Sequence, residues 1–218
     1  MLDVREGSDP LLRRPLGIMD AEPPLIRVYF QLTGRGTRIL AQRRPGDHVQ
    51  VLGPLGNPFP DRSGRRILAV AGGRGIAPLF FALKRYARAN EASLLYGARS
   101  DADLHLRDRI ERLGLKSVAY CTESGDYGRP GRVTDALQEM LTSSQADMTI
   151  ACGPHAMLAA LAAVLEDTTT EDYMSAEALM GCGIGACHSC AITASGGGYL
   201  RVCQDGPVFS REEIQWRT

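Results

Sequence analysis

The rhythm of apolar and polar positions changes twice along this chain. Up to about residue 63, short apolar runs at 25–33, 37–41 and 48–52 alternate with glycine and proline turns, which predicts β structure. Strand-like and helix-like patterns then alternate until about residue 170, and the remaining stretch is rich in cysteine and glycine. The pattern predicts three domains: 1–63, 64–170 and 171–218.

The middle stretch has the pattern of a doubly wound parallel sheet. Its first strand, RILAVA at 66–71, is apolar almost throughout, as expected for a strand covered on both faces. A glycine turn and a helix at 77–89 follow it. Regular alternation of strand and helix favours an α/β fold. The further strands are predicted at 93–96, 117–121 and 148–152, and the further helices near 103–113, 132–142 and 155–165.

Composition and charge exclude some classes of function. The chain has 218 residues, 44% of them apolar and 23% charged, as in an ordinary globular protein. Lys+Arg and Asp+Glu both number 25, so the basic footprint of a nucleic-acid-binding protein is absent from the sequence. No apolar run approaches the roughly 18 residues of a membrane span, and the N-terminus does not resemble a targeting sequence. We expect a soluble, cytoplasmic protein that binds neither nucleic acid nor membrane.

Four cysteines near the C-terminus carry the strongest chemical signal. They are Cys182, Cys187, Cys190 and Cys203. Their C-x4-C-x2-C spacing, with the fourth sulfur thirteen positions further on, is that of a plant-type [2Fe–2S] cluster. Glycines between them let the loop curl around a cluster and bring backbone N–H groups close to the sulfurs. These glycines are Gly181, Gly183 and Gly185. Because such a cluster carries one electron at a time, the motif predicts electron transfer.

Other interpretations of the cysteines fit less well. A structural zinc site usually has paired C-x2-4-C knuckles, and a disulfide framework is typical of small secreted domains. His188 lies within the loop and has the residue type of a Rieske ligand, but four cysteines already supply the ligands, so we expect a solvated loop residue. Cys121 and Cys152 lie outside the motif and are expected to stay reduced.

Two segments of the middle stretch predict a nucleotide site. Gly72, Gly73 and Gly75 follow the first strand and let the backbone approach a pyrophosphate at the start of a helix. Cys152-Gly153-Pro154 ends the last predicted parallel strand, at the same carboxyl edge. A small polarisable thiol there has room to pack beside a nicotinamide ring. A ligand-free turn and simple strand-end packing remain the alternatives.

The first stretch offers a second anion site. Arg14 stands before a rigid proline, and Gly34-Arg35-Gly36-Thr37 is a glycine turn that ends in a hydroxyl. An arginine is suited to bidentate contact with a pyrophosphate. From composition alone, ordinary turn residues explain these segments equally well.

Taken together, these segments give the chain a family resemblance. It resembles the electron-transfer subunits of dihydroorotate dehydrogenase B, iron–sulfur flavoproteins of the ferredoxin–NADP reductase superfamily. The matching pieces follow the family's order over nearly the whole chain, and the last two are the most specific. They are LLRRPLGI, GRGTRIL, GDHVQVLGPLGNPF, AGGRGIAPL, YGAR, ACGPHAM, MGCGIGAC and RVCQDGPVF.

The resemblance implies a fold and a set of binding residues. It implies an FAD-binding β-barrel domain, an NAD-binding α/β domain and a small [2Fe–2S] module in the three stretches above. For FAD it implies Arg14, Pro15, Leu16, Gly17, Tyr29, Phe30, Gln31, Gly36 and Thr37. For NAD(H) it implies Gly72, Gly73, Gly75, Gly153 and Pro154, with Cys152 positioning the nicotinamide as the one catalytic residue. The four motif cysteines would hold the cluster.

Two departures from the family pattern matter. Gly17 stands where the family has Ser or Thr, so a hydroxyl that contacts the flavin is missing and we expect weaker flavin binding or a shifted potential. Only thirteen residues precede Arg14, whereas the family's barrel has strands before this motif. We therefore expect a barrel that lacks its first strands, with an exposed edge.

The resemblance also implies a role and a partner. Electrons would flow between an FMN-containing dihydroorotate dehydrogenase catalytic subunit, the cluster, FAD and NAD(H), in a heterotetramer of two plus two subunits in pyrimidine biosynthesis. Val208, Phe209 and Trp216 are candidate contacts with that partner, and packing of the tail on its own domain explains them equally well. Asp101 and Asp103 would repel a 2′-phosphate and so favour NADH over NADPH.

Two alternatives remain open at this stage. One is the small subunit of a ferredoxin–NADP reductase or sulfide dehydrogenase, some of which carry aspartate in place of one cluster cysteine. The other is an electron carrier that has the cluster and no nucleotide turnover. Retention of FAD by the chain distinguishes the second from the first.

Overall fold

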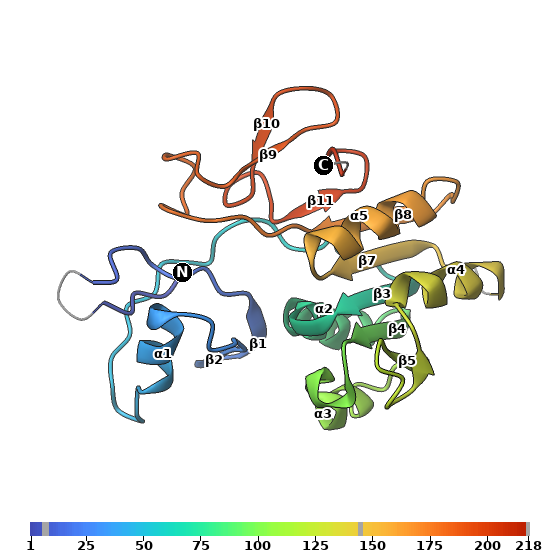
Figure 1. The fold of residues 1–218 in the computed structure, drawn as a ribbon, viewed down its shortest axis with the longest axis horizontal. Coiled ribbons are helices and arrows are strands. Elements are labelled where there is room, and N and C mark those ends of the chain that lie inside the picture. Colours follow the sequence, from blue (N-terminus) through green and yellow to red (C-terminus); the bar gives the residue numbers. More distant parts are fainter. Residues whose placement is uncertain (6–8, 144–145, 217–218) are drawn as a thin grey trace.

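The computed structural model describes residues 1–5, 9–143 and 146–216 of the chain. Figure 1 shows three parts: an N-terminal segment on one side, a sheet with helices on the other, and a small C-terminal module above the gap between them. None of the helices in the described part of the chain combines the length and apolar character needed to cross a membrane.

A seven-stranded sheet forms the centre of the second part. Its order is β11-β8-β7-β3-β4-β5-β6, and all neighbours pair in parallel except β11, which is antiparallel to β8. β3 is the first strand of this sheet in the sequence. β4, β5 and β6 are then added on one side of it, and β7, β8 and β11 on the other, so the strand order reverses between β3 and β7. The strands are β3 (Arg66–Gly72), β4 (Glu91–Ala98), β5 (Ser117–Thr122), β6 (Arg129–Pro130), β7 (Met148–Cys152), β8 (Glu171–Ser175) and β11 (Val208–Ser210).

Helices cover both faces of this sheet. The buried side chains of β3 alternate: Ile67, Ala69 and Ala71 join one core, whereas Leu68 and Val70 join the other. The first core lies under α2 and α3, and the second under α4 and α5. The elements are α2 (Ile76–Tyr86), α3 (Arg107–Glu111), α4 (Val133–Ser143) and α5 (His155–Val164), with short 3-10 turns at Gly73–Gly75 and Asp101–Asp103. The doubly wound α/β fold is confirmed.

The N-terminal segment has little regular structure. β1 (Ile18–Glu22) and β2 (Leu25–Val28) form an antiparallel pair, and single bridges join Leu2 to Arg14 and to Val51. Within the described residues, β1 and β2 form a two-stranded sheet that does not close into a barrel.

The strand expected at 37–41 was wrong, because these residues lie in helix α1 (Arg35–Ala41). The Thr37 hydroxyl accepts hydrogen bonds from the backbone N–H groups of Thr33 and Gly34, which stabilises the first turn of the helix. The helix buries only Gly36 and Ile39. An apolar run of three residues is too short for its period to distinguish helix from strand.

One face of α2 fastens the N-terminal segment to the sheet. Met19 of β1 is buried in the core under α2. Next to it, the buried Asp20 carboxylate accepts hydrogen bonds from Lys84 of α2 at 2.8 Å and from Arg27 of β2 at 3.0 Å. Gly17 also lies against Pro78, where a Cβ would stand 3.7 Å from the proline ring.

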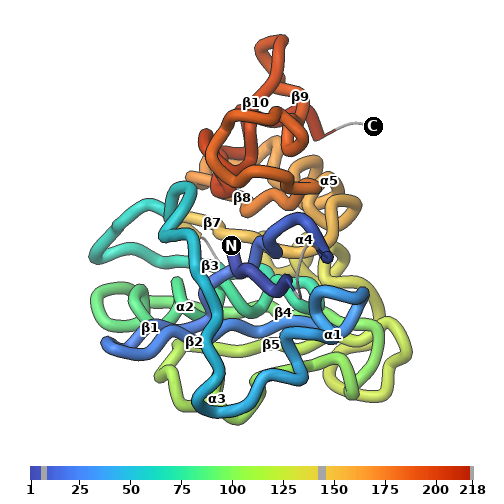
Figure 2. Tube along the Cα trace, turned by 90° about the vertical axis from the view of Figure 1, so that its left-hand side faces the viewer, coloured from blue at the N-terminus to red at the C-terminus, as the bar shows by residue number. Residues whose placement is uncertain are grey.

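The C-terminal module shares strands with the sheet and is not a separate unit beside it. β8 and β11 belong to the seven-stranded sheet, so the sheet continues across the boundary predicted at 171. The hairpin of β9 (Ala191–Thr193) and β10 (Tyr199–Arg201) stands above it, as Figure 2 shows. Val208, Phe209 and Trp216 are all buried, and Phe209 and Trp216 belong to the second core, which resolves their two interpretations in favour of packing within the chain.

Candidate electron-transfer site

The four motif cysteines lie in two pairs. Cys182 and Cys187 face each other, since the backbone N–H of each donates to the sulfur of the other at 3.4 Å. The Sγ atoms of Cys190 and Cys203 are 3.3 Å apart. The Gly185 N–H, from the loop between the first pair, donates to the Cys203 sulfur at 3.2 Å and so connects the two pairs.

This arrangement suits two metal ions better than one. Metal–sulfur bonds of about 2.3 Å place two thiolates of a tetrahedral site about 3.8 Å apart, somewhat more than the Cys190–Cys203 distance. A [2Fe–2S] cluster takes two thiolates on each iron, and the two cysteine pairs supply two each. The residues present therefore fit a two-iron cluster.

Backbone N–H groups surround the sulfurs, as the glycine content of the loop predicted. Besides the contacts above, the Ile184 N–H donates to Cys182 at 3.4 Å. Gly183 and Gly185 adopt left-handed conformations, with φ of 77° and 78°, which side chains disfavour. Gly181 serves differently: its φ is not left-handed, but a Cβ there would stand 3.1 Å from the Cys187 sulfur. Its missing side chain leaves room for the close approach of Cys187.

The two pairs have different surroundings. Cys187 is exposed, and hydrogen bonds from Ser189 lower the pKa of its thiol to about 6. Cys190 and Cys203 are buried, and burial raises the pKa of the Cys203 thiol. His188 is exposed, as the sequence predicted. The Cys182–Cys187 pair therefore forms the outer side of the site, and the Cys190–Cys203 pair forms its inner side.

The glycine turn lies where the strand order of the sheet reverses. Ala71 at the end of β3 pairs with Cys152 at the end of β7, so both segments predicted to bind NAD meet at one carboxyl edge. Ligands of open α/β sheets bind at this position. Gly73 has a φ of 51°. Gly75 packs directly on the next strand, because a Cβ there would collide with the Cys152 carbonyl and stand 2.7 Å from the Gly153 nitrogen.

Cys152 is enclosed in this structure. Its side chain is 1% exposed, and burial together with the charge of Glu177 raises the pKa of the thiol to about 12. It pairs in register with Ser175 of β8. Its thiol is therefore neutral at physiological pH, which suits packing and excludes a thiolate nucleophile.

Two of the residues expected to hold the flavin, Arg14 and Gly36, lie against each other. The Arg14 guanidinium lies across Gly36, with Cζ 3.2 Å from where a Cβ would stand, and within the described residues it forms no ion pair. A cation without a carboxylate partner fits a phosphate site. The Thr37 hydroxyl, in contrast, donates to the Gly34 carbonyl and is committed to α1.

The flavin and nucleotide segments touch through two residues that the sequence did not single out. Arg74, in the turn after β3, donates to the Gln31 side chain. The ring of His105 lies 5.3 Å from that of Tyr29, at 47°. Burial raises the pKa of Tyr29. The sequence held a signal for Arg74, since it lies within the glycine turn, but His105 follows a turn with no motif.

The apolar surface near the cluster was also missed. Leu179 is 88% exposed, and Ile184 and Tyr199 are exposed as well. Tyr199 also lines a pocket of about 540 Å³, together with His188, Ala191, Arg201 and Asp205. Leu179 and Ile184 flank Cys182 in the sequence, so this position next to the cluster motif was the available signal.

Family models match two parts of the chain. The model described as the iron–sulfur cluster binding domain of dihydroorotate dehydrogenase B matches residues 177–215, which include all four motif cysteines. The oxidoreductase NAD-binding domain matches residues 69–163, which include the glycine turn and Cys152.

Solved structures share the arrangement of the parts. A structure of an NADH-dependent reduced ferredoxin–NADP oxidoreductase aligns with a TM-score of 0.83 and 30% identity, over 94% of this chain and 75% of the other. The cytochrome b5 reductase domain of Ulva prolifera nitrate reductase aligns with a TM-score of 0.53 and 26% identity, over 64% of this chain and 65% of the other.

Curated relatives match nearly the whole chain. The electron transfer subunit of dihydroorotate dehydrogenase B (NAD(+)) from Bacillus caldolyticus is 39% identical over 97% of this chain and 83% of its own length. The same subunit from Geobacillus kaustophilus is 38% identical over 97% and 83%. With the cysteine pairs, the nucleotide turn and the fold in agreement, this chain belongs to the family of dihydroorotate dehydrogenase B electron transfer subunits.

Proposed function

We propose that this chain relays electrons between NAD(H) and a dihydroorotate dehydrogenase catalytic subunit in pyrimidine biosynthesis. The observation that carries the proposal is the pairing of the four cysteines in one module, fastened to a sheet whose switch point presents a nucleotide turn. The proposed domains are those of the sequence prediction, with β8 and β11 contributed to the sheet of the middle domain.

The proposal assigns each cofactor to residues of the chain. FAD is held by Arg14–Gly17, Tyr29–Gln31, Gly36 and Thr37, and NAD(H) by Gly72, Gly73, Gly75, Gly153 and Pro154. FAD supplies the exchange between a two-electron hydride donor and one-electron carriers. Arg14 neutralises phosphate charge, Gly73 lets the backbone approach the dinucleotide, and Cys152 fills the edge beside the nicotinamide with an apolar, neutral thiol. None of these side chains acts as an acid or base.

The surface around the outer cysteine pair is the proposed docking site. Leu179 and Ile184, close to Cys182 in the sequence, and Tyr199 of the β9–β10 hairpin all expose apolar side chains in the cluster module. Exposed apolar clusters of this kind mark protein–protein contacts. An FMN-containing catalytic subunit seated here would lie next to the cluster ligands, and two copies of each subunit would form the heterotetramer.

The likeness to a ferredoxin–NADP oxidoreductase supports a second candidate, in which ferredoxin takes the place of the catalytic subunit. Four cysteines, with no aspartate among the ligands, favour the dihydroorotate role. The experiment is an anaerobic visible spectrum of the purified chain before and after NADH, followed by addition of either catalytic subunit with dihydroorotate or oxidised ferredoxin. Bleaching of flavin and cluster bands by NADH, with reduction also by dihydroorotate through the catalytic subunit, is expected. A spectrum without flavin bands that NADH leaves unchanged contradicts the proposal.

The preference for NADH is a finer point. Asp101 forms an ion pair with Arg107 at 2.7 Å, which offsets part of its charge, whereas Asp103 accepts a hydrogen bond from Ser100 at 2.9 Å. Asp103 is therefore the stronger source of repulsion toward a 2′-phosphate. We expect Asp103→Ala to lower the NADH-to-NADPH ratio of kcat/KM more than Asp101→Ala does. Equal ratios in both variants and the parent chain would contradict the carboxylate argument.

A further inference from the structure

Asn57 joins the N-terminal segment to the loop that follows Cys203. Its side-chain amide donates to the carbonyls of Asp205 at 3.1 Å and Val208 at 2.9 Å. Its side-chain oxygen accepts from the Val208 N–H at 2.9 Å. The backbone N–H of Asn57 donates to the Gly206 carbonyl at 2.7 Å. Four hydrogen bonds from one exposed residue thus connect segments about 150 positions apart in the sequence.

The glycine before Asn57 allows the two loops to approach this closely. Gly56 has a φ of 72°, which favours glycine, and a Cβ there would stand 2.6 Å from both the Gly206 carbonyl and the Pro207 ring. A side chain at position 56 would therefore force the two loops apart. The close approach and the hydrogen bonds of Asn57 define one contact between residues 56–57 and 205–208, which we call the Asn57 clamp.

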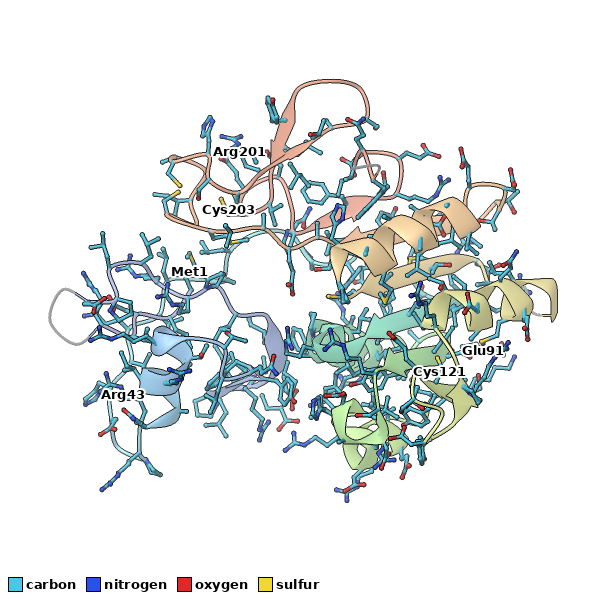
Figure 3. All side chains as sticks on the ribbon, in the orientation of Figure 1. Met1, Arg43, Glu91, Cys121, Arg201 and Cys203 are labelled. Carbon is cyan, nitrogen blue, oxygen red and sulfur yellow. The ribbon has the colours of Figure 1, made fainter. Side chains whose placement is uncertain are left out.

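Further polar contacts connect the Asn57 clamp to the cluster ligands. Asp205, whose carbonyl Asn57 binds, pairs through its carboxylate with Arg201 at 3.2 Å. The Arg201 guanidinium in turn donates to the Gly185 carbonyl at 3.3 Å, and the Gly185 N–H donates to the Cys203 sulfur. Figure 3 shows Arg201 and Cys203 in the same module. A continuous chain of polar contacts therefore runs from the N-terminal segment to the inner cysteine pair.

We propose that Asn57 is a positioning residue that fixes the inner cysteine pair, and hence the cluster, relative to the flavin-binding segment. The inference rests on the proposed function for the flavin. Electron transfer depends steeply on the separation of the two carriers, so a loop held at both ends keeps that separation constant. An exposed asparagine that only stabilised its own loop would form hydrogen bonds with residues close to it in the sequence. Asn57 instead forms hydrogen bonds with three residues of another segment.

A matched control exists in the same chain. Asn90 also makes three side-chain hydrogen bonds to backbone: it donates to the carbonyls of Arg62 at 2.8 Å and Tyr86 at 3.1 Å, and it accepts from Arg65 at 3.0 Å. None of these partners belongs to the cluster module. Asn57→Ala and Asn90→Ala therefore remove the same number of bonds, and only the first removes them from the cluster loop. Asn57→Asp keeps the size but sets an acceptor against two carbonyls.

The test is hydrogen–deuterium exchange of the full chain, combined with its reduction kinetics. We expect Asn57→Ala and Asn57→Asp to speed exchange of the Val208 amide and its neighbours about tenfold or more, as loss of a few hydrogen bonds predicts. Asn90→Ala should leave that segment unchanged. Exchange in β3 and β7 reports whether each variant is folded. The rate of cluster reduction by NADH should fall in the Asn57 variants relative to that by dithionite.

The outcomes separate this inference from the proposed function. Unchanged exchange at 205–208 in a folded Asn57 variant, or equal slowing of the NADH-driven rate in the Asn57 and Asn90 variants, overturns the positioning role. If NADH fails to reduce the cluster of the parent chain, the proposed function is overturned instead. In that case the electron paramagnetic resonance spectrum of the dithionite-reduced cluster replaces the rate: a shift confined to the Asn57 variants supports the clamp, and an unchanged spectrum overturns it.

Discussion

The sheet domain and the N-terminal segment differ in how far they bury their apolar side chains. The sheet has a core on each face, built from fully buried side chains such as Leu94 in one core and Leu161 in the other. The N-terminal segment buries few apolar side chains and leaves others in water. Its exposed apolar residues are Leu11, Leu12, Leu25, Ile26, Leu32, Val51 and Leu55.

The difference shows that the sheet domain is stabilised by its own core and that the N-terminal segment is not. Each buried leucine of the sheet contributes about 1.5–3 kcal/mol by removal from water, whereas the exposed leucines of the N-terminal segment gain little. That segment is held by contacts at its borders: the Asp20–Lys84 pair, the Gly17–Pro78 contact and the Asn57 clamp. We infer that the sheet folds as the scaffold and that the flavin segment depends on it.

The largest expected effect comes from the nucleotide turn of the sheet domain. We expect Gly75→Ala to cost about 4 kcal/mol of unfolding free energy, because the new Cβ meets the backbone of Cys152 and Gly153 rather than a movable side chain. NAD(H) binding should be lost with it. Urea unfolding and nucleotide titration measure the two effects.

Gly196→Ala is the control for this substitution. Gly196 has nothing within 4 Å of a Cβ and does not have a left-handed φ, so we expect a change below about 0.5 kcal/mol. A similar stability of the Gly75 and Gly196 variants would contradict the packing of the turn on β7.

A pair of leucine truncations tests the comparison of the two regions directly. Leu94 is 0% exposed and Leu25 is 57% exposed. We expect Leu94→Ala to cost about 2–4 kcal/mol through the cavity it leaves, and Leu25→Ala to change stability by less than about 0.5 kcal/mol. Denaturant unfolding followed by circular dichroism gives both values. A large cost at Leu25 would mean that the N-terminal segment has a core of its own.

Prediction from the sequence succeeded where a local pattern of residues determines the structure. It was less successful where contacts between distant segments determine it. The apolar run of 66–71 was enough to predict β3, and the cysteine spacing was enough to predict an iron–sulfur module, which the matching family model confirms. It misassigned 37–41, where the Thr37 cap outweighs a short apolar run. It did not indicate that β8 and β11 extend the sheet, or that Asn57 meets Val208, because such pairings between remote segments leave no periodic signal.

The joint between the two regions should depend on pH at both extremes. Hydrogen bonding from Lys84 holds the pKa of Asp20 below its ordinary value of 3.8, and hydrogen bonding to Asp20 raises the pKa of Lys84 above 10.5. The stabilisation by Asp20 is therefore present above pH 3.8 and lost as the pH falls below it. That by Lys84 is present below pH 10.5 and lost as the pH rises.

Lys84→Met removes the dependence at alkaline pH and weakens the one at acidic pH, because Arg27 still bonds to Asp20. We expect it to loosen the N-terminal segment while leaving the sheet intact, with a smaller loss of stability than Leu94→Ala causes. Hydrogen–deuterium exchange of 18–28 should rise, whereas exchange in β3 and β4 should not. Equal loosening of both regions would show that they unfold as one unit.

The smallest expected effect is a gain in flavin affinity. Gly17 lies where a Cβ would make only ordinary contact with Pro78, at 3.7 Å, so a serine fits without moving the backbone. Gly17→Ser supplies the hydroxyl found in the family's motif, and one added hydrogen bond is worth about 0.5–1.5 kcal/mol. We expect the dissociation constant of FAD to fall about two- to tenfold, as measured by quenching of flavin fluorescence. Gly17→Ala is the matched control, because it adds the Cβ without the hydroxyl. If alanine and serine bind FAD equally well, the gain comes from a stiffer backbone, and position 17 does not contact the flavin.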